Sequence, residues 1–222
     1  MTAKPELLRS GHYSPLEERI NIVSHATGLV LGILAFVVLL ARAATYGNAW
    51  HIVSVGIFGA SLIALYAAST IYHSSKNLQL RARMRTMDHA AIYVLIAGTY
   101  TPFTLITLRG AVGWTMFAIT WGMAAIGIAL KLFYTGRYNL ISTLMYVFMG
   151  WVIVFAIKPL IESLSAAGMM WLISGGLAYT LGAVFYSIRR LPFSHSIFHI
   201  FVLIGSTCHF VAVYFFVLPT AA

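Results

Sequence analysis

The sequence predicts an all-α integral membrane protein, a seven-transmembrane-helix bundle with its N-terminus in the cytoplasm and its C-terminus outside. Of its 222 residues, 60% are hydrophobic and 9% are charged, whereas soluble domains average about 45–50% apolar and about 25% charged residues. The apolar residues gather in runs of about 20, the length that crosses a bilayer as a helix. The basic residues lie mostly on one side of these runs, which sets their direction.

Seven apolar runs follow one another with short linkers, and each predicts one span. None of them alternates polar and apolar residues as a barrel strand does. The runs are Asn21–Ala41, Trp50–Tyr72, Met87–Leu108, Ala111–Leu130, Asn139–Ile157, Gly168–Ile188 and Phe193–Leu218. The length suits one domain. We therefore expect a single membrane domain over residues 1–222, in which residues 1–20 form a cytoplasmic tail with a short interfacial helix.

Local signals refine three places along the chain. Ser14-Pro15-Leu16-Glu17 has the order of an N-cap, a first-turn proline and a capping-box glutamate, so a helix should begin before the first run. Pro102 should kink the third span. Leu108-Arg109-Gly110 makes the turn between the third and fourth runs.

The basic residues give the orientation of the bundle. Eleven lie on one side of the predicted spans: Lys4, Arg9, Arg19, Lys76, Arg81, Arg83, Arg85, Lys131, Arg137, Arg189 and Arg190. Only Arg42, Arg109 and Lys158 lie on the other side. The positive-inside rule then places the N-terminus in the cytoplasm. The net charge of +9 is explained by basic loops at an anionic leaflet, so we expect no nucleic-acid partner, and no protein partner is evident.

Four ionisable residues stand at the cytoplasmic edges of three predicted spans. His73 ends the second span, Asp88 lies in the first turn of the third, and His195 and His199 lie one turn apart at the start of the seventh. Ionisable groups against hydrocarbon are costly and indicate a functional site. Their common depth is the strongest functional signal in the chain.

Three imidazoles at one depth favour a metal, and zinc suits imidazole ligands. His73, His195 and His199 would leave one tetrahedral position open, as catalytic zinc sites do. Asp88 could offset the charge of the ion and accept a proton from its bound water. Ser69, one turn deeper than His73, could bind the same water or a substrate carbonyl. The alternative is an internal polar network without metal.

The remaining histidines carry weaker signals. Glu17, Asn21 and His25 form a stripe that should anchor the first helix to its neighbours. His89 should point about 100° away from Asp88, and His209, about 15 Å deeper than His199, could pair inside the bundle or line a cavity. We expect His12 and His51 to face solvent or lipid headgroups.

Several stretches together resemble the haemolysin III-like branch of the progestin and adipoQ receptor family, within the superfamily that contains alkaline ceramidases. The resemblance covers nearly the whole chain from Glu17 onward. It rests on residues 17–25 (EERINIVSH), 69–73 (STIYH), 87–89 (MDH), 98–103 (GTYTPF), 195–199 (HSIFH) and 208–210 (CHF). The Ser-x3-His, Asp and His-x3-His pattern appears in order and on the expected spans.

The resemblance implies a seven-helix bundle with a cytoplasmic N-terminus, in a bacterial cell (inner) membrane. It implies zinc on His73, His195 and His199, with Asp88 hydrogen-bonded to the zinc water and Ser69 nearby. It also implies a cavity that holds a membrane lipid or fatty acid. The chain has almost no N-terminal domain of the kind found in animal receptors, which speaks against hormone binding.

Three functions fit these expectations. The first is an intramembrane zinc hydrolase of a lipid amide or ester, ceramidase-like and involved in lipid homeostasis, with Asp88 as general base. The second is a non-enzymatic lipid sensor or regulator with a structural zinc. The third is a transporter, pore or cytolytic protein. We rank it last, since no charge pairs lie at mid-bilayer depth and nothing looks like an amphipathic pore former.

Overall fold

A computed structural model describes residues 13–134, 139–188 and 190–220 of the chain. It contains seven helices that are long and apolar enough to cross a membrane, which confirms the predicted class and number of spans. The elements are α2 (Pro15–Tyr46), α3 (Ala49–Ser74), α4 (Leu78–Pro102) with η1 (Phe103–Leu108), α5 (Gly110–Tyr134), α6 (Asn139–Trp151) with η2 (Val152–Ala156) and α7 (Ile157–Ser163), α8 (Ala166–Ser187), and α9 (Ser194–Ala212) with η3 (Val213–Val217).

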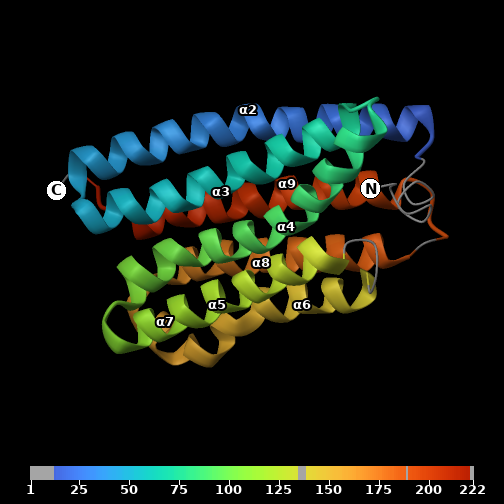
Figure 1. Ribbon diagram of the computed structural model, residues 1–222. Helices are drawn as coiled ribbons and strands as arrows, with labels where there is room; N and C mark the ends of the chain where they lie inside the picture. Colours follow the sequence, from blue (N-terminus) through green and yellow to red (C-terminus); the bar gives the residue numbers. More distant parts are fainter. Residues whose placement is uncertain (1–12, 135–138, 189, 221–222) are drawn as a thin grey trace.

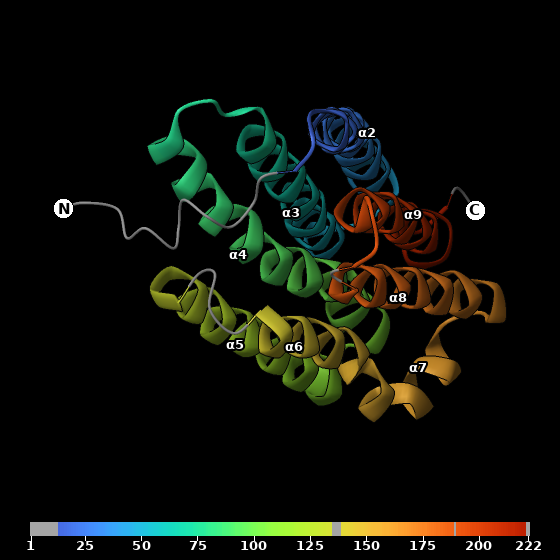
Figure 2. The ribbon, with the colours of Figure 1, turned by 90° about the vertical axis from the view of Figure 1, so that its right-hand side faces the viewer.

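Helices that are neighbours in the sequence pack side by side, and α9 returns to lie between α2 and α8 (Figures 1 and 2). Short linkers enforce this up-and-down order. The packing is closest between α2 and α3, α3 and α4, and α8 and α9, whereas α6 makes fewer contacts with its neighbours. The C-terminal end of α3 and the N-terminal ends of α2, α4 and α9 therefore lie at one end of the bundle (Figure 1).

The first helix begins where the capping signal predicts. The Ser14 hydroxyl accepts a hydrogen bond from the Glu17 amide at 3.2 Å, and Pro15 occupies the first turn. The helix then runs unbroken to Tyr46 and ends at Gly47. Residues 15–20 are the first turns of α2 and not a separate helix, and their expected place at the membrane interface stays a prediction. Residues 1–12, His12 included, lie outside the described residues.

Two predicted boundaries fall short because charged residues extend the helices beyond their apolar runs. The third span begins at Leu78, nine residues before Met87, since Asn77 caps it and nothing interrupts the helix. Lys131, expected among the basic loops, instead lies in the last turn of α5 and is 3% exposed. The side chain of Lys131 is thus buried, and the helix continues past it to Tyr134. Arg137 and Arg189 lie outside the described residues.

Prolines mark two irregular stretches. After Pro102, the third span passes into the π-helical turn η1, which accommodates a residue that lacks an amide hydrogen. The fifth span tightens into the 3-10 turn η2 ahead of Pro159 and continues to Ser163. It therefore ends six residues beyond the predicted Ile157. Arg109 and Gly110 make the predicted turn with φ values of 47° and 54°.

The surface and the interior divide as a lipid-facing bundle requires. Large apolar side chains are exposed along every span, for example Val30, Trp114, Leu144 and Leu181. The main core cluster gathers side chains from α2, α3, α4 and α9 around Tyr66 and Phe58. Polar residues are buried inside this apolar shell, and most of those with charge or metal-binding capacity lie at the end where α9 begins.

Candidate metal centre

Three imidazoles meet at the end of the bundle where α9 begins. His73 comes from the last turn of α3, and His195 and His199 come from the first two turns of α9. The Nε2 atom of His195 lies 3.1 Å from that of His73 and 3.0 Å from that of His199. Their side chains are buried, and their potential ligand atoms lie within 4.8 Å of one another. The structure thus brings the three predicted ligands together.

Proton counting shows that these nitrogens fit a cation. His73 Nδ1 lies 2.7 Å from a Glu18 carboxylate oxygen, which can only accept, so this nitrogen carries the ring proton. A neutral His73 ring therefore presents a bare Nε2. His199 Nδ1 lies 3.2 Å from the hydroxyl of Ser24, and that hydroxyl donates to the Asn21 carbonyl at 3.0 Å. His199 must then donate through Nδ1 and also presents a bare Nε2.

His195 can place a proton toward only one of the two bare nitrogens. The other bare nitrogen would then be buried about 3 Å from His195 Nε2 without a donor, unless a second ring proton gave a buried ring a positive charge. A metal ion removes this conflict by accepting all three lone pairs. Nitrogen ligands around tetrahedral zinc lie about 3.3 Å apart, close to the observed spacings. The donor set therefore fits a metal ion.

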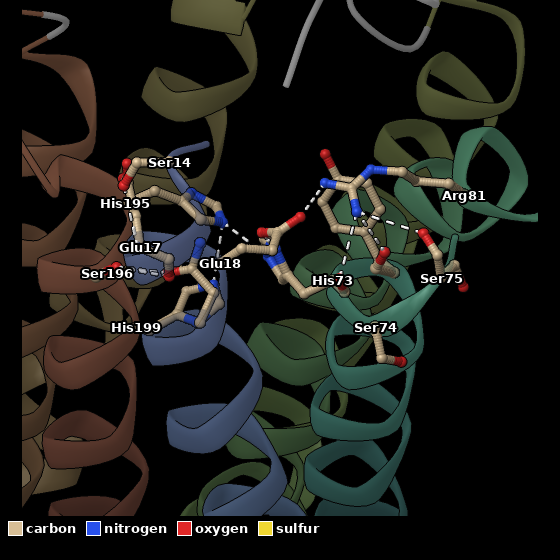
Figure 3. A network of polar contacts seen from close by, with 12 residues as sticks. Ser14, Glu17, Glu18, His73, Ser74, Ser75, Arg81, His195, Ser196 and His199 are labelled. Carbon is tan, nitrogen blue, oxygen red and sulfur yellow. Dashed lines mark hydrogen bonds and ion pairs between the residues drawn. The ribbon is translucent and has the colours of Figure 1, made fainter. Parts of the chain in front are cut away.

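Glu18 on α2 fixes the orientation of His73 (Figure 3). Its other carboxylate oxygen pairs with the guanidinium of Arg81. Arg81 also reaches the carbonyl of His73 at 3.3 Å and stacks on the ring of Tyr72. Carboxylates that accept from the second nitrogen of a ligating histidine fix its tautomer and raise its basicity. Glu18 occupies that position for His73.

A second set of contacts joins α2 to α9. Ser196 donates to Asn21 Oδ1 at 2.6 Å, and His25 stacks on His199 with ring centroids 3.5 Å apart and planes 7° apart. Asn21 and His25 thus join α2 to α9, as expected for two members of the Glu17, Asn21 and His25 stripe. Neither ring nitrogen of His25 has a hydrogen-bond partner among the described residues.

Asp88 and Ser69 lie beside the cluster without joining it. Asp88 on α4 is 6% exposed and interacts electrostatically with His73. The Ser69 hydroxyl on α3 is adjacent to the Asp88 carboxylate, but its oxygen forms no hydrogen bond of ordinary geometry among the described residues. A carboxylate and an available hydroxyl thus stand next to the imidazoles, where the sequence places them.

The histidines His89, His209 and His51 lie outside the cluster and contact other groups. His89 turns away from the cluster and its Nδ1 lies 2.8 Å from the Arg85 carbonyl. His209 lies deep in the bundle, with Nε2 3.2 Å from the Leu172 carbonyl. His51 was expected to face solvent or headgroups, but it is 7% exposed. Its ring caps the start of α3 by contacting the backbone amide and side chain of Asn48, which explains its burial.

Tyr13 covers the cluster at the end of the bundle. Its ring stacks on His195 with centroids 4.8 Å apart and an angle of 18° between the planes. Burial raises the pKa of the Tyr13 phenol well above its ordinary value, so this group is neutral at physiological pH. The cluster is thereby shielded on the side that leads out of the membrane.

A cavity reaches the metal centre from inside the bundle. It has a volume of about 110 Å³, and it is bordered by Asp88, His195 and His199 at one end. Its walls come from every long helix, and they are mainly apolar. The loosely packed α6 contributes Tyr146 and Trp151.

The sequence analysis missed Glu18 and Ser24 as partners of the clustered histidines His73 and His199. Glu17 drew attention because it lines up with Asn21 and His25, whereas Glu18 points about 100° away around the helix. One signal was available: ligating histidines commonly donate to a carboxylate, and the chain has only five acidic residues. Ser24 carried no comparable signal, because its role depends on the packing of α2 against α9.

We expect Glu18→Gln to weaken metal binding at least about tenfold, because a neutral amide is a poorer acceptor for His73 and loses its ion pair with Arg81. Glu17→Gln is the matched control, since its side chain does not contact the histidines. Competition with a zinc-binding dye measures both affinities. Equal affinities for the two variants would contradict the role given to Glu18.

The fold and the site define this chain as a seven-helix integral membrane protein with a buried three-histidine cluster that could hold a metal ion. A family model described as "Haemolysin-III related" matches residues 13–210, and the chain belongs to this family. The resemblance inferred from the sequence motifs is therefore confirmed.

Relatives of the chain agree with this assignment. It is 46% identical to Hemolysin-3 of Bacillus cereus over 206 residues, which cover 93% of this chain and 94% of the relative. It is 46% identical to the Hemolysin-3 homolog of Bacillus subtilis (strain 168) over 200 residues, or 90% of this chain and 94% of the relative. The human monocyte to macrophage differentiation factor, a distant relative in the progestin and adipoQ receptor family, is 30% identical over 216 residues, or 92% of this chain and 87% of the relative.

Proposed function

We propose that the protein is an intramembrane zinc-dependent hydrolase that cleaves an amide or ester bond of a membrane lipid. One observation carries the proposal: a mainly apolar cavity ends at Asp88, His195 and His199. A lipid whose acyl chain occupies that cavity would bring its head-group carbonyl to the imidazole cluster. Apolar walls with a few convergent polar groups are typical of binding sites for small molecules.

Zinc is the metal that best suits the donor set. Three neutral imidazoles and one further position are the ligand pattern of catalytic zinc, and His73, His195 and His199 would hold the ion. When bound, zinc would supply a Lewis acid that polarises a carbonyl group and favours ionisation of water.

The side chains around the cluster would have separate roles in the proposed reaction. Asp88 would accept a proton from the attacking water and then return it to the leaving amine or alcohol. Ser69 would hold the Asp88 carboxylate or the substrate carbonyl through its hydroxyl group. Glu18 would keep the Nδ1 proton of His73 in place. Tyr13 would limit access from the aqueous side, so that substrate enters from the bilayer.

We also propose that the metal centre lies near the cytoplasmic face of a bacterial cell membrane. Arg19, Lys76, Arg81, Arg83 and Arg190 belong to the end of the bundle that carries the histidines, while Arg42, Arg109 and Lys158 belong to the opposite end. Basic residues favour the cytoplasmic side, which places the N-terminus there and the C-terminus outside.

One observation favours a second function, a non-enzymatic lipid sensor with a structural metal. Tyr13 stacks on His195 and His25 stacks on His199, and these rings would restrict the approach of a substrate carbonyl to the metal. Both functions place a lipid in the cavity, and they differ in whether the lipid is cleaved.

Turnover distinguishes the two functions. Purified protein in lipid nanodiscs is incubated with a panel of long-chain N-acyl amides and acyl esters, and released fatty acid is measured by mass spectrometry. We expect release of many fatty acids per protein, loss of release after chelation, and recovery when zinc is restored. Tight binding of these lipids without any product would instead support the sensor.

A further inference from the structure

The deep end of the cavity carries two buried polar groups that have no partner among the described residues. Thr99 on α4 is 5% exposed, and His209 on α9 is 6% exposed. Both border the same cavity as Asp88 and His199. The Thr99 hydroxyl and His209 Nδ1 form no hydrogen bond with any residue that the structure describes. A buried group that loses its water without gaining a partner is destabilising, so these atoms require an explanation.

The two groups lie at one depth. The helices α4 and α9 both begin at the metal end of the bundle. Thr99 follows Asp88 by eleven residues, and His209 follows His199 by ten. At 1.5 Å per residue, each lies about 15 Å along its helix from the metal centre. The wall between the two levels includes Ile92, Leu95 and Val202. The cavity therefore has two polar levels separated by an apolar stretch.

The ring of His209 is held so that its Nδ1 is an acceptor. Its Nε2 lies 3.2 Å from the Leu172 carbonyl, and a carbonyl can only accept, so Nε2 carries the proton. The ring packs so tightly on α8 that a Cβ at Gly175 would lie 2.2 Å from its Cδ2 atom. Tyr179 packs edge-on at 5.4 Å. The neutral ring cannot reorient freely, and its Nδ1 lone pair awaits a donor.

The Thr99 hydroxyl differs from those of nearby threonines in its hydrogen bonding. Threonines in helices commonly donate to the carbonyl of the preceding turn. Thr101 donates to the Ala97 carbonyl at 2.9 Å, and Thr104 donates to the Tyr100 carbonyl at 3.1 Å. Thr99 forms no such bond, so its hydroxyl is available to donate and to accept. An acceptor nitrogen and a free hydroxyl suit a ligand group that both donates and accepts.

We infer that the deep end of the cavity binds a hydroxyl group carried on the acyl chain of the lipid. This inference rests on the proposed lipid in the cavity and names its chemical class: a hydroxylated long-chain lipid with a hydroxyl about 15 Å from its head group. His209 Nδ1 would accept a hydrogen bond from the ligand hydroxyl, and the Thr99 hydroxyl would donate one to the ligand oxygen. A chain without that hydroxyl leaves both groups unpaired.

Binding of matched fatty acids tests the inference. The ligands are one saturated long-chain fatty acid and its analogues with a single hydroxyl at successive positions, and affinity for the purified protein in nanodiscs is measured by competition. We expect the analogue with its hydroxyl about 15 Å from the carboxylate to bind about tenfold more tightly than the parent, which corresponds to about 1.4 kcal/mol. Analogues with the hydroxyl nearer the carboxylate should gain nothing.

Four variants assign that preference to the deep site. Thr99→Val and His209→Phe should each reduce the preference to less than about threefold, whereas Thr99→Ser should keep it. Thr207→Val is the control, because Thr207 is exposed on α9 and its hydroxyl is already bonded to the Leu203 carbonyl. Metal content and melting temperature show whether each variant has folded.

The outcomes separate this inference from the proposed function. Equal affinities for parent and hydroxylated chains would overturn the inference alone, and water would then satisfy the two groups. A preference that survives in both Thr99→Val and His209→Phe would also overturn it. Failure of every chain to bind would overturn both the inference and the proposed lipid site. Tighter binding of the hydroxylated chain would support the inference, whereas the hydrolase is judged separately by the release of fatty acid from N-acyl amides and acyl esters.

Discussion

Replacing His195 with alanine is expected to reduce bound metal from about one ion per chain to nearly none. His195 is the middle member of the cluster, within 3.1 Å of His73 and 3.0 Å of His199. Its loss leaves two ligands where zinc sites in proteins use three or four. Because metal that binds only the folded state stabilises it, the variant should also unfold at a lower temperature than the metal-loaded wild type.

Elemental analysis of purified protein measures this loss directly. His89→Gln is a suitable control, since His89 is on α4 and faces the Arg85 carbonyl rather than the cluster. We expect this control to keep the wild-type metal content. A His195→Ala protein that retained a full equivalent of zinc would show that the metal is held elsewhere.

Asp88→Asn is expected to lower turnover by about 10²–10⁴-fold while metal content stays at the wild-type level. The substitution preserves the shape of a side chain that is almost fully buried but removes its capacity to accept a proton. Ser69→Ala should cost less, about tenfold, because it removes one hydrogen bond and no proton acceptor.

Product release and metal content must be measured on the same preparations. Unchanged turnover in Asp88→Asn would remove Asp88 from the chemistry. Loss of metal together with turnover would show that the carboxylate holds the site together and would leave the general base unidentified.

Much of the fold could be predicted because short stretches of sequence determine where each helix lies. Each span requires about 20 apolar residues, and capping residues such as Ser14 mark a helix start. The boundaries that differ are those where helix continues past the hydrocarbon, as at Leu78 and Lys131. Apolar composition predicts which residues lie in the hydrocarbon, whereas the end of a helix depends on capping and helix-breaking residues.

The residues of the candidate site could be predicted from their depth along the spans, but their contacts could not. Assigning a direction to each span brought His73, Asp88, His195 and His199 to one level, and the structure brings the three imidazoles into contact. Depth says nothing about which side of a helix meets which neighbour. The contact between Glu18 and His73 and the burial of His51 both depend on helix rotation and capping, so neither could be read from spacing alone.

Anomalous diffraction from crystals of the purified protein, recorded on both sides of the zinc absorption edge, tests the central claim most directly. We expect one strong zinc peak per chain, placed between the Nε2 atoms of His73, His195 and His199 and about 2.0–2.1 Å from each. A protein that carries zinc but shows the peak away from these three nitrogens, or shows three hydrogen-bonded imidazoles without a metal, would contradict the account.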